Sequence, residues 1–213
     1  MSGLNDSSNI PGVKQPTLRR DASRNARRIL DAGRAVLREN PHASADDIAR
    51  AAGLGIATLY RRFPTRDDLV RAVIWDIFAT DIAPALTRAE GEADPRTGLR
   101  IAFEAAMRTA AHERISPPMG MTLELAQSFL DPVSRLIRRG QEQGFLRPDL
   151  DPENDTLRLL LMLLSVLPTF SQHSEGWNRY LELVMEVLTL TPVEPLPPAE
   201  AIDDPFQRAK VRH

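Results

Sequence analysis

The sequence contains no cysteine and no long apolar run, and each absence excludes a class of protein. Without cysteine, neither a disulfide nor a thiolate metal site can form. The most apolar run, Leu157 to Leu167, includes Arg158 and is too short and too charged to span a bilayer. Residues 1–5 have neither the basic residues nor the apolar segment of a secretory signal. We therefore expect a soluble, cytoplasmic protein that makes no membrane contact.

Motifs for catalysis and for metal binding are also lacking. No group of residues has metal-ligand spacing, no Gly-rich phosphate loop occurs, and nothing resembles a Ser/His/Asp arrangement on a fixed scaffold. The sequence therefore predicts a protein that is not an enzyme and that requires no metal and no cofactor.

Charge is distributed unevenly along the chain. Residues 1–75 hold 13 Lys and Arg against 8 Asp and Glu, whereas residues 76–213 hold 14 against 21. The first third is therefore basic and the remainder acidic, although the whole chain has a formal charge of only −2. Such a split indicates an anionic partner, such as nucleic acid, at the N-terminal end. A chance fluctuation in surface charge is the alternative.

The periodicity of the chain is helical. Strand-like alternation is absent, β-branched residues are sparse, and no internal repeat occurs. Four helix starts pair a capping side chain with proline, at 94–95, 116–117, 131–132 and 151–152. Capping boxes mark two more, at Ser44 and Thr65. These signals predict an all-α fold of about nine helices, near residues 23–39, 45–52, 56–62, 66–88, 95–114, 117–129, 132–143, 152–171 and 175–189.

Four segments follow from this pattern. Residues 1–20 are rich in Ser, Asn, Gly and Pro and are expected to form a disordered arm. Residues 21–66 are expected to form a small helical domain, and residues 67–190 a larger helical body. Residues 191–213 contain five prolines and are expected to form an extended tail.

A helix-turn-helix pattern lies in the basic third of the chain. The helix opened by Ser44 is followed by the short turn Gly53-Leu54-Gly55 and then by a helix that Pro64 ends. At about 1.5 Å per residue, this second helix is about ten ångströms long, which is comparable to the width of a DNA major groove.

The short helix has one apolar and one basic side. At about 100° per residue, Ile56, Leu59 and Phe63 share a face. The free face is small, basic and hydroxylated and carries no carboxylate. Its residues are Ala57, Thr58, Arg61 and Arg62, with Tyr60 at the boundary. A merely solvated pair of arginines is the alternative to a binding surface.

These side chains suit two kinds of DNA contact. Arg61 points directly off the free face and can donate bidentately to guanine, whereas Arg62 lies nearer the packed edge and is expected to hold the backbone. The hydroxyls of Thr58 and Tyr60 suit phosphate oxygens. Thr65 and Arg66 begin the next predicted helix, where free amides and the helix dipole favour a phosphate.

The segment "ILDAGRAVLRENPHASADDIARAAGLGIATLYRRFPTRDDLVRAV" resembles the DNA-binding domain of the TetR family of bacterial transcriptional regulators. The resemblance covers residues 27–73, and its core is "DIARAAGLGIATLYRRFPTRDDL". A weaker resemblance, "GQEQGFLRPDLDP" at residues 140–152, is similar to the link between the seventh and eighth helices of many such proteins. The family fold, a three-helix DNA-binding head on a helical ligand-binding and dimerisation body, agrees with the predicted helices.

The resemblance implies roles for individual residues. Ile56, Ala57 and Arg61 match base-facing positions of the recognition helix, and Thr58, Tyr60 and Arg62 match positions that commonly touch the DNA backbone. Ser44 and Arg66 match frequent phosphate contacts. Three departures stand out: Asp46 replaces a basic residue of some members, Asn40-Pro41-His42 replaces the usual glycine, and Gly55 replaces the commoner Ser or Thr cap.

The body of such a regulator would dimerise and hold an effector. By resemblance, the last two helices pair with their copies in a homodimer as a four-helix bundle, with Pro168 kinking the first of them. Twofold symmetry then implies a near-palindromic operator. Packing within one chain is the alternative for each of these residues. The predicted interface residues are Leu159, Leu163, Leu167, Leu183 and Val187.

An effector pocket is expected among the fourth to eighth helices, although the same residues would also suit an ordinary core. His112 and Glu124 are its predicted polar groups. The predicted apolar lining is Trp75, Phe78, Phe103, Met107, Met119, Met121, Leu125, Phe129 and Met162.

The sequence thus predicts a homodimeric repressor that a small, largely apolar effector releases from its operator DNA. A regulator of the same fold controlled by a protein partner, or by nothing, is the first alternative. An enzyme with an accessory helix-turn-helix is the second, and it predicts turnover that depends on His112, Glu124 or His173.

Overall fold

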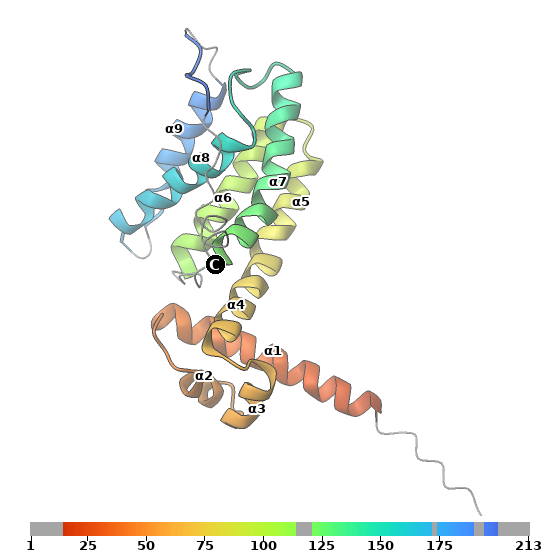
Figure 1. The fold of residues 1–213 in the computed structure, drawn as a ribbon. Helices are drawn as coiled ribbons and strands as arrows, with labels where there is room; N and C mark the ends of the chain where they lie inside the picture. The colour runs from red at the N-terminus through yellow and green to blue at the C-terminus, as the bar shows by residue number, and fades with distance from the viewer. Residues whose placement is uncertain (1–14, 114–120, 172–173, 190–193, 200–213) are drawn as a thin grey trace, which may run out of the picture.

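The computed structural model describes residues 15–113, 121–171, 174–189 and 194–199, and within these ranges it contains helices and no strand. This confirms the predicted all-α fold. A small head at the N-terminal end is joined to a larger body by the long rod that begins with α4 (Figure 1). The elements are α1 Gln15–Glu39, α2 Ala45–Ala51, α3 Ile56–Arg62, α4 Arg66–Ile77, the π-helical η1 Phe78–Ile82, α5 Ala83–Gly91, α6 Pro95–Glu113, α7 Met121–Glu142, α8 Asn154–Val166, the 3₁₀ segment η2 Leu167–Thr169 and α9 Asn178–Thr189.

Two separate apolar cores hold the head and the body. The head core joins α1, α2, α3 and α4, and it extends along α4 as far as Ile77. The body core joins η1 with α5 to α9. Trp75 and Leu125 pack against both cores, so they lie at the junction of head and body.

The first helix begins earlier than the sequence predicted. Residues 1–14 lie outside the described residues, but α1 begins at Gln15, so the expectation of a disordered arm through residue 20 is wrong for residues 15–20. Pro16 is compatible with the first helical turn, where its missing N–H has no partner to lose. The five residues after Pro16 contain no helix breaker, and the helix continues through them.

The helix predicted at 66–88 is a longer rod with a wide turn in it. The rod runs from Arg66 to Gly91 as α4, η1 and α5. The Ala83 N–H donates to the Phe78 carbonyl, five residues back, which is the hydrogen bond of a π-helix. Pro84 follows directly in the first turn of α5. Because proline has no N–H, the wide turn occurs where an α-helical hydrogen bond could not have formed.

Prolines also explain two further corrections. The helix start predicted at Asp131-Pro132 is wrong, because α7 runs without a break from Met121 to Glu142 with Pro132 inside it. An internal proline costs a helix about 3 kcal/mol, but here four neighbouring side chains are buried in the body core: Phe129, Val133, Leu136 and Ile137. The start predicted at 116–117 lies outside the described residues.

Pro168 ends α8 rather than kinking it. The α-helix stops at Val166, and Leu167 donates its N–H to the Leu164 carbonyl, three residues back, as the chain enters η2. Proline at the second position of η2 has no N–H with which to extend the α-helix.

Candidate nucleic-acid interface and apolar pocket

The turn between α2 and α3 depends on Gly53. Its φ of 63° lies in the left-handed region, which residues with a side chain rarely adopt. The Leu54 N–H then donates to the Ala49 carbonyl at 3.0 Å, which closes the end of α2. Because the chain reverses in so few residues, α3 packs against α2 at a fixed angle.

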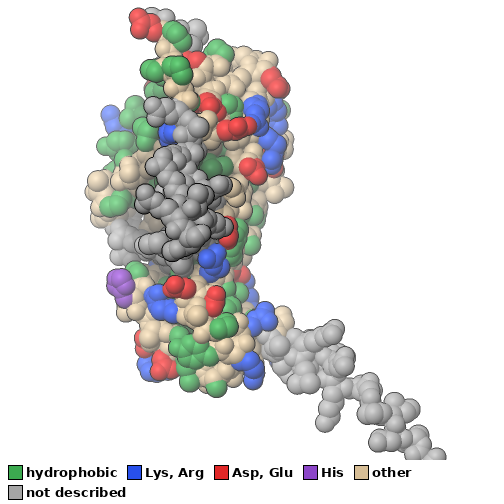
Figure 2. Space-filling view, in the orientation of Figure 1, with side chains coloured by type: hydrophobic (Ala, Val, Ile, Leu, Met, Phe, Trp, Pro, Cys, Tyr) green, Lys and Arg blue, Asp and Glu red, His purple; other side chains and the backbone are tan. Residues whose placement is uncertain are grey.

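The helix α3 has the two faces that its sequence predicts. Leu59 and Phe63 are buried in the head core, and Ile56 is half-buried against it. Ala57, Tyr60, Arg61 and Arg62 are exposed, whereas Thr58 is half-buried. Neither Arg61 nor Arg62 forms an ion pair with any residue that the structure describes. The basic side chains of α3 are therefore exposed to solvent. The helices α2 and α3 lie at the lower end of the molecule (Figure 1), where Lys and Arg side chains are visible on the surface (Figure 2).

The predicted phosphate contacts Ser44 and Thr65 both cap helices. The Ser44 hydroxyl donates to Asp47 Oδ2 at 2.6 Å and accepts from the Asp47 N–H at 3.2 Å. Thr65 makes the same pair of bonds with Asp68, at 2.7 and 3.0 Å. The hydrogen bond from the Ser44 hydroxyl, and then that from its backbone N–H, lowers the pKa of Asp47. Each hydroxyl has only one proton, so a hydroxyl that donates to a phosphate must give up its bond to the aspartate carboxylate, although its oxygen can still accept the capping bond.

Arg66 is also engaged within the head. Its Nε donates to the Ala43 carbonyl at 3.0 Å, and its Nη2 donates to the Pro41 carbonyl at 2.7 Å. These bonds fasten the start of α4 to the loop between α1 and α2. That loop is the segment in which Asn40-Pro41-His42 replaces the usual glycine.

An apolar pocket of about 260 Å³ lies between α4, η1, α6, α7 and α8. Among the described residues its lining is almost wholly aliphatic and aromatic, and Thr109 and Glu113 are the two polar side chains. The described lining is Ile74, Ile77, Phe78, Ile82, Ala106, Thr109, Ala110, Glu113, Leu125, Ala126, Phe129, Leu157, Leu160, Leu161 and Leu164.

The pocket contains three of the residues predicted for it, namely Phe78, Leu125 and Phe129. Phe103 and Met107 do not line it, because both are completely buried in the body core. Trp75 packs at the junction of the two cores instead. Met162 is 61% exposed on the outer side of α8 and is absent from the pocket. Met119 and the side chain of Met121 lie outside the described residues.

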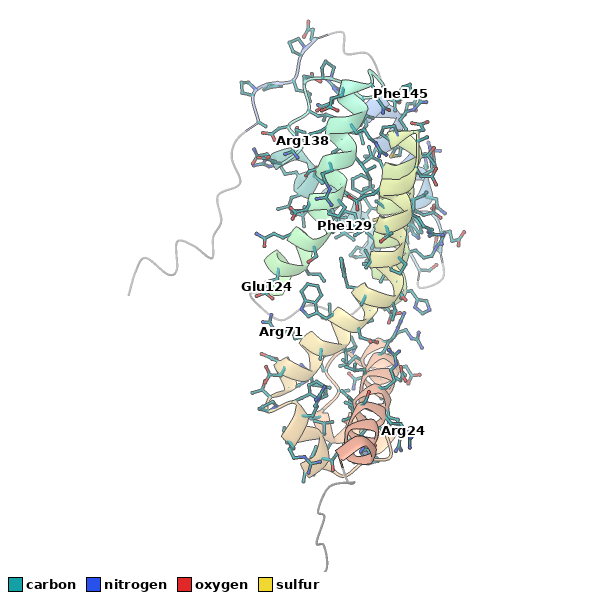
Figure 3. All side chains as sticks on the ribbon, turned by 90° about the vertical axis from the view of Figure 1, so that its right-hand side faces the viewer. Arg24, Arg71, Glu124, Phe129, Arg138 and Phe145 are labelled. Carbon is teal, nitrogen blue, oxygen red and sulfur yellow. The ribbon has the colours of Figure 1, made fainter. Side chains whose placement is uncertain are left out.

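The polar groups predicted for the pocket lie elsewhere. Glu124 of α7 is an exposed side chain whose Oε2 pairs with Nη1 of Arg71 in α4 at 3.0 Å, so it links body to rod (Figure 3). The side chain of His112 is 60% exposed, and its Nδ1 lies 2.9 Å from Glu113 Oε1. His173 lies outside the described residues.

Glu113 is the polar residue that the sequence prediction missed. It is only 4% exposed, at the C-terminal end of α6. Arg34 of α1 donates to Glu113 Oε1 from Nε at 3.1 Å and from Nη2 at 2.7 Å. A usable signal was present, because Glu113 falls seven residues after Ala106 and thus continues the buried stripe of α6.

Arg34 joins the head to the body through two carboxylates. Besides Glu113, its guanidinium pairs with Asp81 in η1. Burial lowers the pKa of Arg34, but the bonds to Glu113 and Asp81 outweigh that effect and raise it. The guanidinium is therefore a permanent positive charge between the two carboxylates.

The last two helices carry an exposed apolar surface, which we call the α8/α9 face. On α9, the predicted interface residues Leu183 and Val187 are 47% and 50% exposed. Leu163 is wrong as an interface residue, because it is buried in the core of its own chain. Leu159 and Leu167 are half-buried against that core. Met162 and Tyr180, which were not predicted for this role, are also exposed on these helices.

The described residues contain neither a membrane-spanning helix nor a candidate metal site. None of their helices is long and apolar enough to cross a membrane. Nor do three or more of their His, Asp or Glu side chains gather where they could hold a metal ion.

Comparison with known proteins gives the same assignment for the N-terminal part. Residues 29–73 match the model of bacterial regulatory proteins of the tetR family. A stretch of 104 residues is 36% identical to the HTH-type transcriptional repressor LfrR of Mycolicibacterium smegmatis. This stretch covers 48% of the chain and 51% of that repressor, so the match spans only about half of the relative's length.

Solved structures extend the likeness over the body. The regulator SCO0520 of Streptomyces coelicolor matches with a TM-score of 0.57 and 26% identity, over 78% of this chain and 99% of that one. LfrR in complex with proflavine matches with a TM-score of 0.58 and 24% identity, over 82% and 99%.

The head is thus a helix-turn-helix DNA-binding domain of the bacterial regulator type, with α3 as its exposed second helix. Residues 29–73 thus match the DNA-binding domain of the TetR family of bacterial regulatory proteins, and the chain as a whole is similar in fold to regulators of that family.

Proposed function

We propose that this protein is a homodimeric repressor. It binds a near-palindromic operator through α3, and a small, largely apolar effector releases it from that DNA. The observation that carries the DNA-binding part is the exposed face of α3. Its two arginines have no ion-pair partner among the described residues, and the tight turn at Gly53 fixes the position of α3 against α2.

Several features support base reading by this face. Arg61 can donate bidentately to guanine, and the small side chain of Ala57 permits close approach to a base edge. Tyr60 and Arg62, also exposed, suit phosphate oxygens. Ser44, Thr65 and Arg66 have internal hydrogen bonds, so we assign them first to shaping the head and only then to phosphate contact.

The α8/α9 face supports the homodimer. Met162 on α8 and Tyr180, Leu183 and Val187 on α9 are large apolar side chains left exposed by the fold of one chain. An isologous twofold contact between two such faces would bury them against their copies and form a four-helix bundle. The same symmetry would present the two α3 helices to successive major grooves.

The apolar pocket supports a small-molecule effector over control by a protein partner or by nothing. It lies among α4, η1, α6, α7 and α8, where a bound molecule touches the rod that carries the head. The structural neighbour LfrR was solved with proflavine, a small aromatic molecule. An effector would act through its different affinities for the DNA-binding and released conformations.

Fluorescence anisotropy with the DNA that flanks the protein's own gene tests the proposal. We expect saturable binding that survives an excess of random DNA, at a stoichiometry of two chains per site. Equal affinity for the flanking and the random DNA would contradict sequence-specific regulation. The effector part fails separately if no member of a library of small apolar compounds shifts thermal unfolding.

A further inference from the structure

Only one of the two carboxylate oxygens of Glu113 has hydrogen-bond partners among the described residues. Oε1 accepts two hydrogen bonds from Arg34 and lies 2.9 Å from Nδ1 of His112. Oε2 is buried and has no hydrogen-bond partner among the described residues. A buried carboxylate oxygen without a donor is costly, because burial removes its hydration and nothing replaces it. Glu113 also lines the apolar pocket, so a small movement of its carboxylate would bring this oxygen to a molecule bound there.

We propose that the effector is a small apolar amine whose ammonium group donates to Glu113 Oε2. This inference rests on the proposed function, since it names the chemical class that the pocket of that regulator would accept. The apolar lining would hold the hydrocarbon part of the amine, and Thr109, the second polar side chain of the pocket, offers a hydroxyl beside it.

The local charge favours a cation. Two carboxylates, Glu113 and Asp81, surround the single guanidinium of Arg34, so this group of three carries one net negative charge. An ammonium group balances that charge and supplies the missing donor in one contact. An anionic ligand would place a further negative charge beside Glu113, and a purely apolar ligand would leave Oε2 unpaired.

The same carboxylate links the pocket to the DNA-binding head. Arg34 belongs to α1 in the head core, whereas Glu113 belongs to α6 and Asp81 to η1. Within η1, Phe78 and Ile82 line the pocket while Asp81 holds Arg34. An ammonium on Oε2 therefore shares Glu113 with Arg34 and weakens the hold of the body on α1. By linkage, loss of Arg34 must strengthen binding of the amine.

Three probes with one bicyclic body test the proposal: naphthylmethylamine, methylnaphthalene and naphthoate. Their binding to the full-length protein is measured by calorimetry near neutral pH. We expect the amine to bind about 10- to 100-fold more tightly than methylnaphthalene, the range of a charge-assisted hydrogen bond, and naphthoate to bind most weakly. Glu113→Gln should remove the preference, bringing the affinity for the amine down to that for methylnaphthalene. Glu104→Gln is the matched control, because Glu104 is half-buried on the same helix and pairs with Arg108 outside the pocket.

The outcomes separate this inference from the proposed function. If none of the three probes binds, the effector part of the proposed function fails and the inference fails with it. If all bind wild-type protein equally, the pocket takes ligands but Glu113 does not select among them, and the inference alone is overturned. An amine preference that persists in a folded Glu113→Gln also overturns it. The comparison on wild-type protein decides the matter should this variant not fold.

A second pair of variants tests the link to the head. Arg34→Met should raise the affinity for naphthylmethylamine at least several-fold and leave methylnaphthalene unaffected. Arg108→Met, which removes an exposed arginine of α6, should change neither affinity. Equal amine affinity in Arg34→Met and wild type would show that the ligand and the head do not share Glu113.

Discussion

Gly33 of α1 and Val73 of α4 lie so close that a Cβ on Gly33 would approach Val73 Cγ2 to 2.7 Å. Val73 is completely buried, so its methyl group has little room to move. This contact sets the distance between the first helix and the rod, and with it the packing of the head core.

Gly33→Ala should therefore destabilise the protein. The gain in helix propensity is about 1 kcal/mol, but overpacking of a rigid core costs about 1–3 kcal/mol, and we expect a net loss of about 1 kcal/mol. Thermal or urea unfolding measures it. Gly91→Ala is the matched control, because no atom lies within 4 Å of a Cβ there, and it should cost nothing. An equal effect of the two substitutions would contradict the close packing.

Arg61→Ala and Arg62→Ala should weaken DNA binding in different ways. We expect Arg61→Ala to cost about 1–3 kcal/mol at the operator and to relax the preference for one base pair, because a bidentate contact to guanine is lost. Arg62→Ala should weaken binding to every DNA sequence alike. It should also lower the slope of log affinity against log salt concentration by about one, because one phosphate contact is lost. Anisotropy with systematically substituted operators measures both. A sequence-independent loss for Arg61→Ala would refute its reading role.

Arg66→Met should act first on stability. Its hydrogen bonds to the Pro41 and Ala43 carbonyls are lost, and we expect a cost of about 1 kcal/mol in unfolding free energy. Arg50→Met should cost less than about 0.5 kcal/mol, because Arg50 is mostly exposed and pairs with Asp47 on its own helix. The dependence of log affinity for DNA on log salt concentration then separates the two roles of Arg66. An unchanged slope means that Arg66 only fastens α4 to the loop between α1 and α2, and a slope lower by about one means that it contacts a phosphate as well.

Leu183→Glu combined with Val187→Glu should convert a dimer to a folded monomer. Each change places a charge in the apolar α8/α9 face, where burial without a partner is strongly unfavourable. Sedimentation measures the assembly state, and circular dichroism shows whether the fold is intact. Leu196→Glu, at an exposed leucine outside these helices, is the control and should leave the assembly unchanged. A double variant that sediments like wild type would rule out this face as the interface.

The sequence predicted best where local chemistry alone determines the structure. The bounds of α2 and α3 follow from the capping box at Ser44 and from Pro64, and both agree with the structure to within a residue. Pro132 and Pro84 misled the prediction in opposite ways. Pro132 suggests a helix start, but buried neighbours carry the helix through it, and the wide turn before Pro84 was not foreseen. Such outcomes depend on packing between distant segments, which local signals do not contain.

In the candidate site, too, local features were predictable and features that depend on packing between distant segments were not. The two faces of α3 were predictable from helix geometry, because a seven-residue helix between Gly55 and Pro64 leaves little choice. The pocket was not, because which Phe or Met faces a cavity depends on how five helices pack. Helix spacing could place Glu113 on the buried side of α6, but its pairing with Arg34, 79 positions away, could not be read from the sequence.

The wide turn at η1 has a mechanical consequence. An α-helix can absorb a push by exchanging hydrogen bonds between neighbouring carbonyls, but Pro84 has no N–H to exchange, so this turn cannot tighten into an ordinary one. Phe78 and Ile82 of this turn also line the pocket. We therefore expect a molecule bound there to displace the rod that carries the head rather than to tighten the turn.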